Sequence, residues 1–185
     1  LIMRSNAQEL DTLKNIIISS SRIDLPFKEN SRTIQIVTAE EIKKLGVTNV
    51  ADALQQVAGI DVRRQGINGM QADLYIRGGG FDQTLLLIDG IKVDDPQTGH
   101  HTLNLALPIE MIKRIEIIKG PAARIFGQNA FTGAINIVTK DVDETGLITK
   151  IQSGSFGQSI AEATGTIKLK ESNHIVHFSK SFSQG

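Results

Sequence analysis

The chain has 185 residues, of which 40% are apolar, and it carries 20 basic and 20 acidic side chains. This length and composition suffice for one domain of ordinary size with an appendage. The balanced charge provides no overall field that would attract nucleic acid, and the absence of cysteine excludes a disulfide framework or a thiolate metal site.

The N-terminal part of the chain predicts an extended segment, a strand and a short helix. Residues 11–22 contain a β-branched run flanked by polar residues, and residues 33–37 alternate as in a strand. Thr38 and Glu41 then have the spacing of a capping box, in which side chains satisfy backbone N–H groups of the first helical turn. We expect Gly46 to end this helix.

A second helix and two strands are predicted next. Residues 49–57 place apolar side chains on one helical face, and Gly59 is the expected left-handed terminator. Residues 60–63 and 73–77 have the composition of strands, and the three glycines at residues 78–80 predict a flexible break.

A tight hairpin is predicted in the middle of the chain. The dipeptide Asp89-Gly90 favours a type I′ turn, and it separates apolar runs at residues 85–88 and 91–93. Residues 94–104 are polar and rich in turn formers, which predicts a loop. Residues 108–111 begin with proline, which suits the first turn of a short helix.

Residues 116–140 predict a strand, a turn and a second strand. Both ends are β-branched and apolar, and Gly120, Gly127 and Gly133 are expected to supply the backbone freedom that a sharp reversal needs. The residues run E-I-I-K-G-P-A-A-R-I-F-G-Q-N-A-F-T-G-A-I-N-I-V-T-K. This order closely resembles the signature of the plug domain in TonB-dependent outer-membrane receptors.

Two further motifs support the resemblance, which extends over residues 11–140. I-R-G at residues 76–78 and L-I-D-G at residues 87–90 resemble family motifs and occur in the expected order. The chain departs from the signature at Ala123, where the family has serine, and at Thr132, where it has glycine.

From residue 147 the chain becomes a series of alternating strands. Residues 161–169 place small and aliphatic side chains at one parity and polar ones at the other, as in a sheet that is apolar on one side. Residues 173–182 predict another strand, although Lys180 interrupts its apolar face. A transmembrane strand needs roughly 9 to 11 residues, so this stretch supplies about three strands, too few to close a barrel.

The resemblance implies an α+β fold, in which a small plug domain with a mixed β-sheet and short helices precedes a few antiparallel strands of a truncated β-barrel. The expected divisions are an N-terminal segment at residues 1–22, the plug at residues 23–142 and the beginning of the barrel at residues 143–185. The N-terminus has no basic stretch followed by an apolar core, so we expect a removed signal or a fragment.

The resemblance also implies a function. The plug of such a receptor lies inside the barrel lumen in the outer membrane, with its N-terminus in the periplasm, and gates the active import of a scarce ligand. Ferric siderophores, cobalamin, haem and oligosaccharides all remain possible cargoes. No enzymatic activity, resident cofactor or metal is predicted. The expected partners are TonB, the rest of the barrel and the small-molecule ligand; the alternative is a signalling or adaptor plug that acts as a protein-interaction module.

The resemblance assigns three sets of candidate site residues. The TonB box, an extended segment that TonB would capture by strand addition, comprises Asp11, Thr12, Leu13, Ile16, Ile17, Ile18 and Ser19. The candidate ligand loops comprise Gly79, Gly80, Phe81, Asp82, Gln83, Asp94, Asp95, Gln97, Thr98, His100 and His101. The candidate contacts with the barrel wall are Arg77, Arg114, Glu116 and Lys119, of which the last three are expected to form a charged, solvated strand face.

Other interpretations of these residues are weaker. The box could instead be an edge strand of the plug. The three glycines do not precede the Gly-Lys-Ser/Thr of a phosphate loop, so a mobile loop is favoured. His100 and His101 are neighbours whose side chains should point apart, and a solvated loop is favoured over a metal site. His174 and His177 should likewise face opposite sides of a strand. A small hydrolase or nucleotide-binding domain is not favoured, because the chain lacks the Ser-His-Asp constellation or phosphate loop that such a domain needs.

Overall fold

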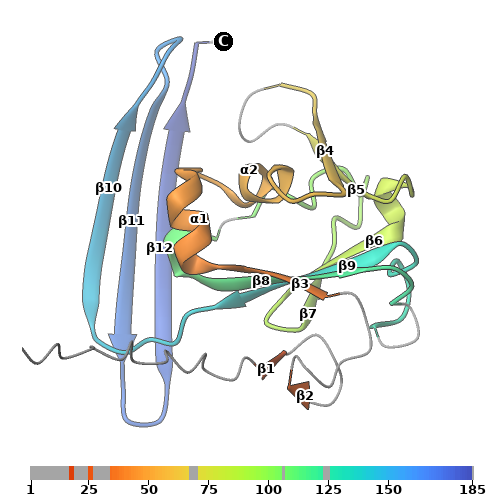
Figure 1. Cartoon of the computed structure of the whole chain (residues 1–185). Helices are drawn as coiled ribbons and strands as arrows, with labels where there is room; N and C mark the ends of the chain where they lie inside the picture. Colours follow the sequence, from red (N-terminus) through yellow and green to blue (C-terminus); the bar gives the residue numbers. More distant parts are fainter. Residues whose placement is uncertain are drawn as a thin grey trace, which may run out of the picture.

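The computed structural model describes residues 17–18, 25–26, 34–66, 71–105, 107–122 and 126–184 (Figure 1). Its centre is a five-stranded mixed sheet in the order β3-β8-β9-β6-β7, in which β6 and β9 run parallel and the other neighbours antiparallel. These strands span Ile34–Thr38 (β3), Thr84–Ile88 (β6), Ile91–Val93 (β7), Ile112–Lys119 (β8) and Gly133–Thr139 (β9).

Two helices and a hairpin cover one face of this sheet (Figure 1). They are α1 (Ala39–Leu45), α2 (Val50–Gln55), β4 (Ile60–Arg64) and β5 (Ala72–Ile76). The larger apolar core lies between them and the sheet, where Leu54 and Ile76 pack in one cluster with Ile115, Ile117 and Ile135. A smaller cluster on the opposite face includes Leu85, Leu87, Ile118 and Ala134.

A separate three-stranded antiparallel sheet follows the central sheet and stands beside α1 in Figure 1. Its strands are β10 (Gly146–Ser153), β11 (Ser159–Lys168) and β12 (Asn173–Phe182). The prediction of an α+β fold with a mixed sheet, short helices and three further antiparallel strands is therefore confirmed. The domain boundaries predicted at residues 22 and 142 stay predictions. Within the described ranges, no helix has the length and apolar character to span a membrane.

Several local predictions are confirmed. Thr38 and Glu41 form the capping box of α1, and Gly46 ends that helix with a φ of 65°. Asp89 and Gly90 adopt φ values of 49° and 79°, as a type I′ turn between β6 and β7 requires. These features depend on neighbours in the sequence, so local chemistry determines them.

Two predictions about backbone shape are wrong. Helix α2 ends at Gln55 with a right-handed cap at Gln56, and Gly59, although left-handed at a φ of 80°, belongs to the turn that leads into β4. Gly133 does not supply backbone freedom, because its φ is not among the positive values. Instead, a Cβ at this position would lie 2.5 Å from the carbonyl oxygen of Ile118, so glycine is needed for close strand packing.

Candidate functional site

The two predicted ligand loops lie against each other. The first is the turn that contains the 3₁₀ helix η2 (Phe81–Gln83), and the second is the loop of residues 94–104, hereafter the 94–104 loop. The ring centroids of Phe81 and His100 are 4.3 Å apart, with the planes inclined by 30°. Residues almost twenty positions apart in the sequence thus form one surface.

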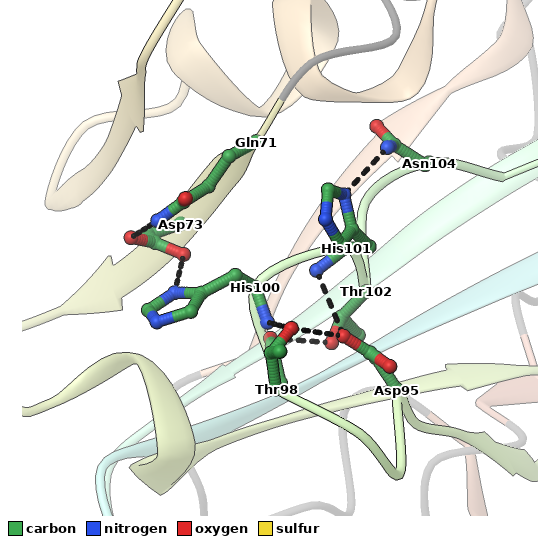
Figure 2. A network of polar contacts seen from close by, with 9 residues as sticks. Gln71, Asp73, Asp95, Thr98, His100, His101, Thr102 and Asn104 are labelled. Carbon is green, nitrogen blue, oxygen red and sulfur yellow. Dashed lines mark hydrogen bonds and ion pairs between the residues drawn. The ribbon is translucent and has the colours of Figure 1, made fainter.

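His100 also contacts the β4–β5 hairpin (Figure 2). Its Nδ1 atom lies 2.7 Å from Oδ1 of Asp73, and Gln71 Nε2 donates a hydrogen bond of 3.0 Å to the other carboxylate oxygen. The Asp73 side chain is only 7% exposed, whereas the His100 side chain is 33% exposed. The loop is largely exposed, as expected, but the His100 side chain is partly buried because the 94–104 loop folds back onto β5. His101 is exposed and contacts Asn104 within the loop, as Figure 2 shows.

Asp95 organises the 94–104 loop from within. Its carboxylate accepts hydrogen bonds from the Thr98 hydroxyl at 2.7 Å, from the Gln97 backbone N–H at 3.1 Å and from the His101 backbone N–H at 3.4 Å. The Thr98 hydroxyl, followed by the Gln97 amide, lowers the pKa of Asp95 to about 2, because these donors stabilise the charged form. The loop is thus held by its own hydrogen bonds despite its exposure.

A cavity of about 310 Å³ lies between the two ligand loops and the edge of the central sheet. Its lining includes Phe81, Asp82, Asp94, Thr98 and Asn129. Its volume lies at the lower end of the roughly 300–1,000 Å³ that is typical of small-molecule pockets. In the described parts of the chain no three His, Asp or Glu side chains are grouped so that they could hold a metal ion.

The glycines of the first loop form a hydrogen-bonded turn, and the mobility expected of this loop stays a prediction. The Gly79 N–H donates to the carbonyl oxygen of Ile76, and the Gly80 N–H donates to Gln83 Oε1 at 3.2 Å. A Cβ on Gly79 would collide with the Thr132 side chain. Thr132, the residue that departs from the family signature, therefore fills the space beside Gly79 and donates its hydroxyl to the Gln83 carbonyl at 3.0 Å.

Two of the predicted barrel contacts are instead paired inside the plug. Arg114 and Glu116 form an ion pair of 2.7 Å on β8, with side-chain exposures of 14% and 0%. Asn136 on β9 donates to the same carboxylate at 3.1 Å. The expectation of a solvated face is wrong for Glu116, because β8 is a central strand. Alternation of charges could not distinguish a wet face from a buried ion pair.

The other two predicted barrel contacts lie close together at the end of β5 and β8. Lys119 Nζ donates to Gln35 Oε1 at 2.6 Å and to the carbonyl oxygen of Ala58. Burial first, and then the neighbouring charge of Arg77, lowers the pKa of Lys119. Among the residues that the structure describes, no carboxylate forms an ion pair with Arg77 or Lys119.

A contact that the sequence did not predict joins the plug to the three-stranded sheet. Glu110, in the 3₁₀ helix η3 (Ile109–Met111), lies 2.8 Å from Lys150 on β10, which also lies 3.7 Å from Glu162 on β11. The sequence did carry one indication of this contact: Lys150 and Glu162 alternate with the apolar side chains and therefore lie on the opposite face of the sheet, directly across from each other. Nothing in the sequence identified Glu110 as their partner.

Only part of the predicted TonB box lies within the described residues. Ile17–Ile18 (β1) pairs in antiparallel register with Leu25–Pro26 (β2), and neither joins the central sheet. The remaining box residues, namely Asp11, Thr12, Leu13, Ile16 and Ser19, lie outside the described residues.

Comparison with known proteins shows the protein family to which this chain is related. A family model described as the TonB-dependent Receptor Plug Domain matches residues 26–134. The chain is 34% identical over 134 residues to the vitamin B12 transporter BtuB of Vibrio vulnificus strain YJ016, covering 72% of this chain and 22% of that one. It is 29% identical over 162 residues to BtuB of strain CMCP6, covering 87% of this chain and 26% of that one.

Solved structures share the fold. The pyoverdine outer membrane receptor FpvA from Pseudomonas aeruginosa PAO1 matches with a TM-score of 0.71 and 21% identity, over 90% of this chain and 24% of that one. The alcaligin outer membrane receptor FauA from Bordetella pertussis matches with a TM-score of 0.66 and 18% identity, over 87% and 28%. The chain spans about a quarter of the length of these proteins. It belongs to the family of TonB-dependent receptor plug domains.

Proposed function

We propose that this chain is the plug region of an outer-membrane receptor that binds a scarce ligand and gates its import, with no enzymatic step. The observation that carries the proposal is the convergence of the two predicted ligand loops in a domain of the plug family. The plug lies in the barrel lumen with its N-terminus in the periplasm. The relatives are named as transporters and receptors, which does not favour the signalling or adaptor alternative.

The ligand that we propose is a corrinoid of the vitamin B12 type. The relatives at 29% and 34% identity are named as vitamin B12 transporters. The two ligand loops, residues 79–83 and 94–101, contain three aspartates and no lysine or arginine. Lys92 lines the same cavity and pairs with Asp94 at 2.9 Å, so the remaining acidic groups leave the surface negative. Such a surface disfavours a polyanionic ligand and accepts hydrogen bonds from the peripheral amides of a corrinoid.

We assign Arg77 and Lys119 to contacts with acidic residues of the barrel wall, in the part of the receptor that follows this chain. Two neighbouring cations without a carboxylate partner among the described residues support this assignment. Arg114 and Glu116 are less suited to the same role, because they already pair with each other inside the sheet.

The energy-coupling role is tested with the C-terminal domain of TonB. We expect it to bind the chain through residues 11–19 by strand addition, in which backbone N–H groups donate to an exposed sheet edge. Ile17→Pro removes one donor and should abolish binding, whereas Ile17→Ala keeps the backbone donor and should retain most of it. Equal binding by the two variants would place the TonB site elsewhere, and no binding by the unaltered chain would remove the support for energy coupling.

A further inference from the structure

His100 lies where three segments meet (Figure 2). From β5, the Asp73 carboxylate approaches its Nδ1 atom to 2.7 Å. From η2, the Phe81 ring stacks on its imidazole at 4.3 Å. The backbone of His100 belongs to the 94–104 loop, where its N–H lies 3.4 Å from the Thr98 hydroxyl. One side chain thus connects both ligand loops to the β4–β5 hairpin.

The partner of His100 is a nearly buried charge. Asp73 is 7% exposed, although β5 turns this side chain away from the core that Leu74 and Ile76 enter. A carboxylate taken out of water needs compensating donors, and Gln71 supplies one while His100 supplies the other. The 94–104 loop shields Asp73, so burial of the carboxylate and closure of the loop occur together.

The 94–104 loop is held together by hydrogen bonds between its own residues. Asp95 accepts three hydrogen bonds from within it, and the Thr102 hydroxyl donates to the Gly99 carbonyl at 2.9 Å. Gly99 adopts a φ of 75°, and a Cβ there would lie 3.1 Å from the Phe81 ring, so glycine allows the loop to sit on that ring. The Asp73 carboxylate on β5 contacts the His100 ring, whereas the Asp95 carboxylate accepts from the backbone of the loop.

We propose that His100 and Asp73 form a latch that holds the 94–104 loop on β5 in the position in which it contacts the ligand. The ligand-binding role of the loop rests on the proposed function, whereas the latch itself is a property of the fold. His100 and Asp73 are positioning residues: they set where the loop lies, and other loop residues touch the ligand. Opening of the latch would separate the two ligand loops and expose the Asp73 carboxylate.

The latch is tested by measuring the position of the loop directly. The chain contains no cysteine, so Gln56→Cys on the plug body and Gln97→Cys on the loop provide two unique sites for spin labels. We expect one narrow distance distribution for the labelled chain and a broad or shifted one after His100→Ala. The matched control is His101→Ala. The hydrogen bond that this ring forms within the described residues is with Asn104 in the same loop, so the loop position should not change.

Two further variants separate the latch from general destabilisation. His100→Phe keeps a ring on Phe81 but removes the Nδ1 contact, and should release the loop as His100→Ala does. Asp73→Ala/His100→Phe leaves no buried carboxylate unpaired, and its effect should not exceed that of either single change, because the two residues act through one contact. An unchanged distribution in the folded His100→Phe variant, or additive effects in the double variant, would overturn the latch.

The effect of the latch on ligand binding is measured as the affinity of cyanocobalamin for the receptor that contains this chain. His100→Phe removes one charge-assisted contact that orders the loop, so we expect it to bind about tenfold more weakly. Lys44→Gln, at an exposed position of α1 outside both ligand loops, should leave binding unchanged. Released loops with unchanged affinity would contradict the positioning role. Failure of the unaltered receptor to bind cyanocobalamin would instead contradict the proposed ligand, while the distance measurement still decides the latch.

Discussion

The central sheet and the three-stranded sheet β10–β12 differ in how far their apolar side chains are buried. In the central sheet, β8 and β9 are buried on both faces, between the two apolar clusters. In β10–β12, one face carries exposed apolar side chains such as Leu147, Ile151 and Phe178, and the other carries Lys150 and Glu162 towards the plug. The central sheet therefore completes its core within the described chain, whereas β10–β12 exposes an apolar surface that a lipid or a neighbouring strand would have to cover.

The two sheets also differ in where their polar residues lie and in what these residues contact. In the central sheet, buried polar groups join the family motifs to each other: Asn136 donates to Glu116 and accepts from the Gly90 N–H at 2.9 Å. Asp89 accepts from both the backbone N–H and the hydroxyl of Thr139. The signature strands and the L-I-D-G hairpin are thus one hydrogen-bonded network. In β10–β12 the ion-paired residues Lys150 and Glu162 instead lie at the boundary with the plug.

The largest expected difference between the sheets concerns buried charge. Glu116→Ala removes one partner of an ion pair inside the central sheet and leaves the Arg114 guanidinium, 14% exposed, with less compensation. Removing one partner of a buried pair costs roughly 3 to 5 kcal/mol, and we expect the low end here. The matched change Glu162→Ala on β11 should cost at most about 1 kcal/mol, because Lys150 lies 3.7 Å from Glu162 and keeps Glu110 at 2.8 Å.

Urea unfolding of the full chain, followed by circular dichroism, measures both variants. Equal costs for the two substitutions would mean that the central sheet tolerates loss of the Glu116 carboxylate as well as the partly exposed surface of β11 tolerates loss of Glu162. That result would remove the distinction between the two sheets.

A smaller difference is expected between two strand glycines. Gly133→Ala in β9 places a methyl group 2.5 Å from the Ile118 carbonyl oxygen and 2.9 Å from Ile76 Cδ1, where the backbone oxygen cannot move away alone. Overpacking of this kind costs roughly 1 to 3 kcal/mol. Gly146→Ala in β10 meets only the Thr166 hydroxyl at 3.7 Å and should lie within about 0.5 kcal/mol of the unaltered chain.

The unfolding free energies of the two glycine variants provide the check. If Gly146→Ala were the more costly change, β10 would be packed more tightly than its exposure indicates, and the contrast between the sheets would be reversed.

Most features that neighbouring residues determine were predicted, although the helix end expected at Gly59 was wrong, and the contacts between distant residues were missed. The capping box at Thr38 and the turn at Asp89-Gly90 involve residues at most three positions apart, so propensity and hydrogen-bonding chemistry were sufficient. Burial of Glu116 depends on strands that pair with it across twenty or more residues. Contact of His100 with Asp73, 27 positions away, depends on how a loop folds back, and periodicity carries no information about that.

The smallest expected effect lies at the junction between the two sheets. Asp141 follows β9, and its carboxylate accepts a hydrogen bond of 2.9 Å from Lys113 on β8. This hydrogen bond, and then the charge of Lys113, lowers the pKa of Asp141. A depressed carboxyl pKa stabilises the fold at pH values above the unfolded pKa of about 3.9, and that stabilisation is lost as the pH falls below it.

Lys113→Gln should therefore raise the pKa of Asp141 and cost at most about 1 kcal/mol near neutral pH, since both side chains are largely exposed. The cost should fall towards zero in acid, where Asp141 is protonated in both proteins. NMR titration of the Asp141 carboxyl carbon measures the pKa, and unfolding at two pH values measures the cost. A cost that persists in acid would show that Lys113 supports the junction by packing rather than by charge. The junction would then be stabilised by packing, as the central sheet is, and not by exposed charges.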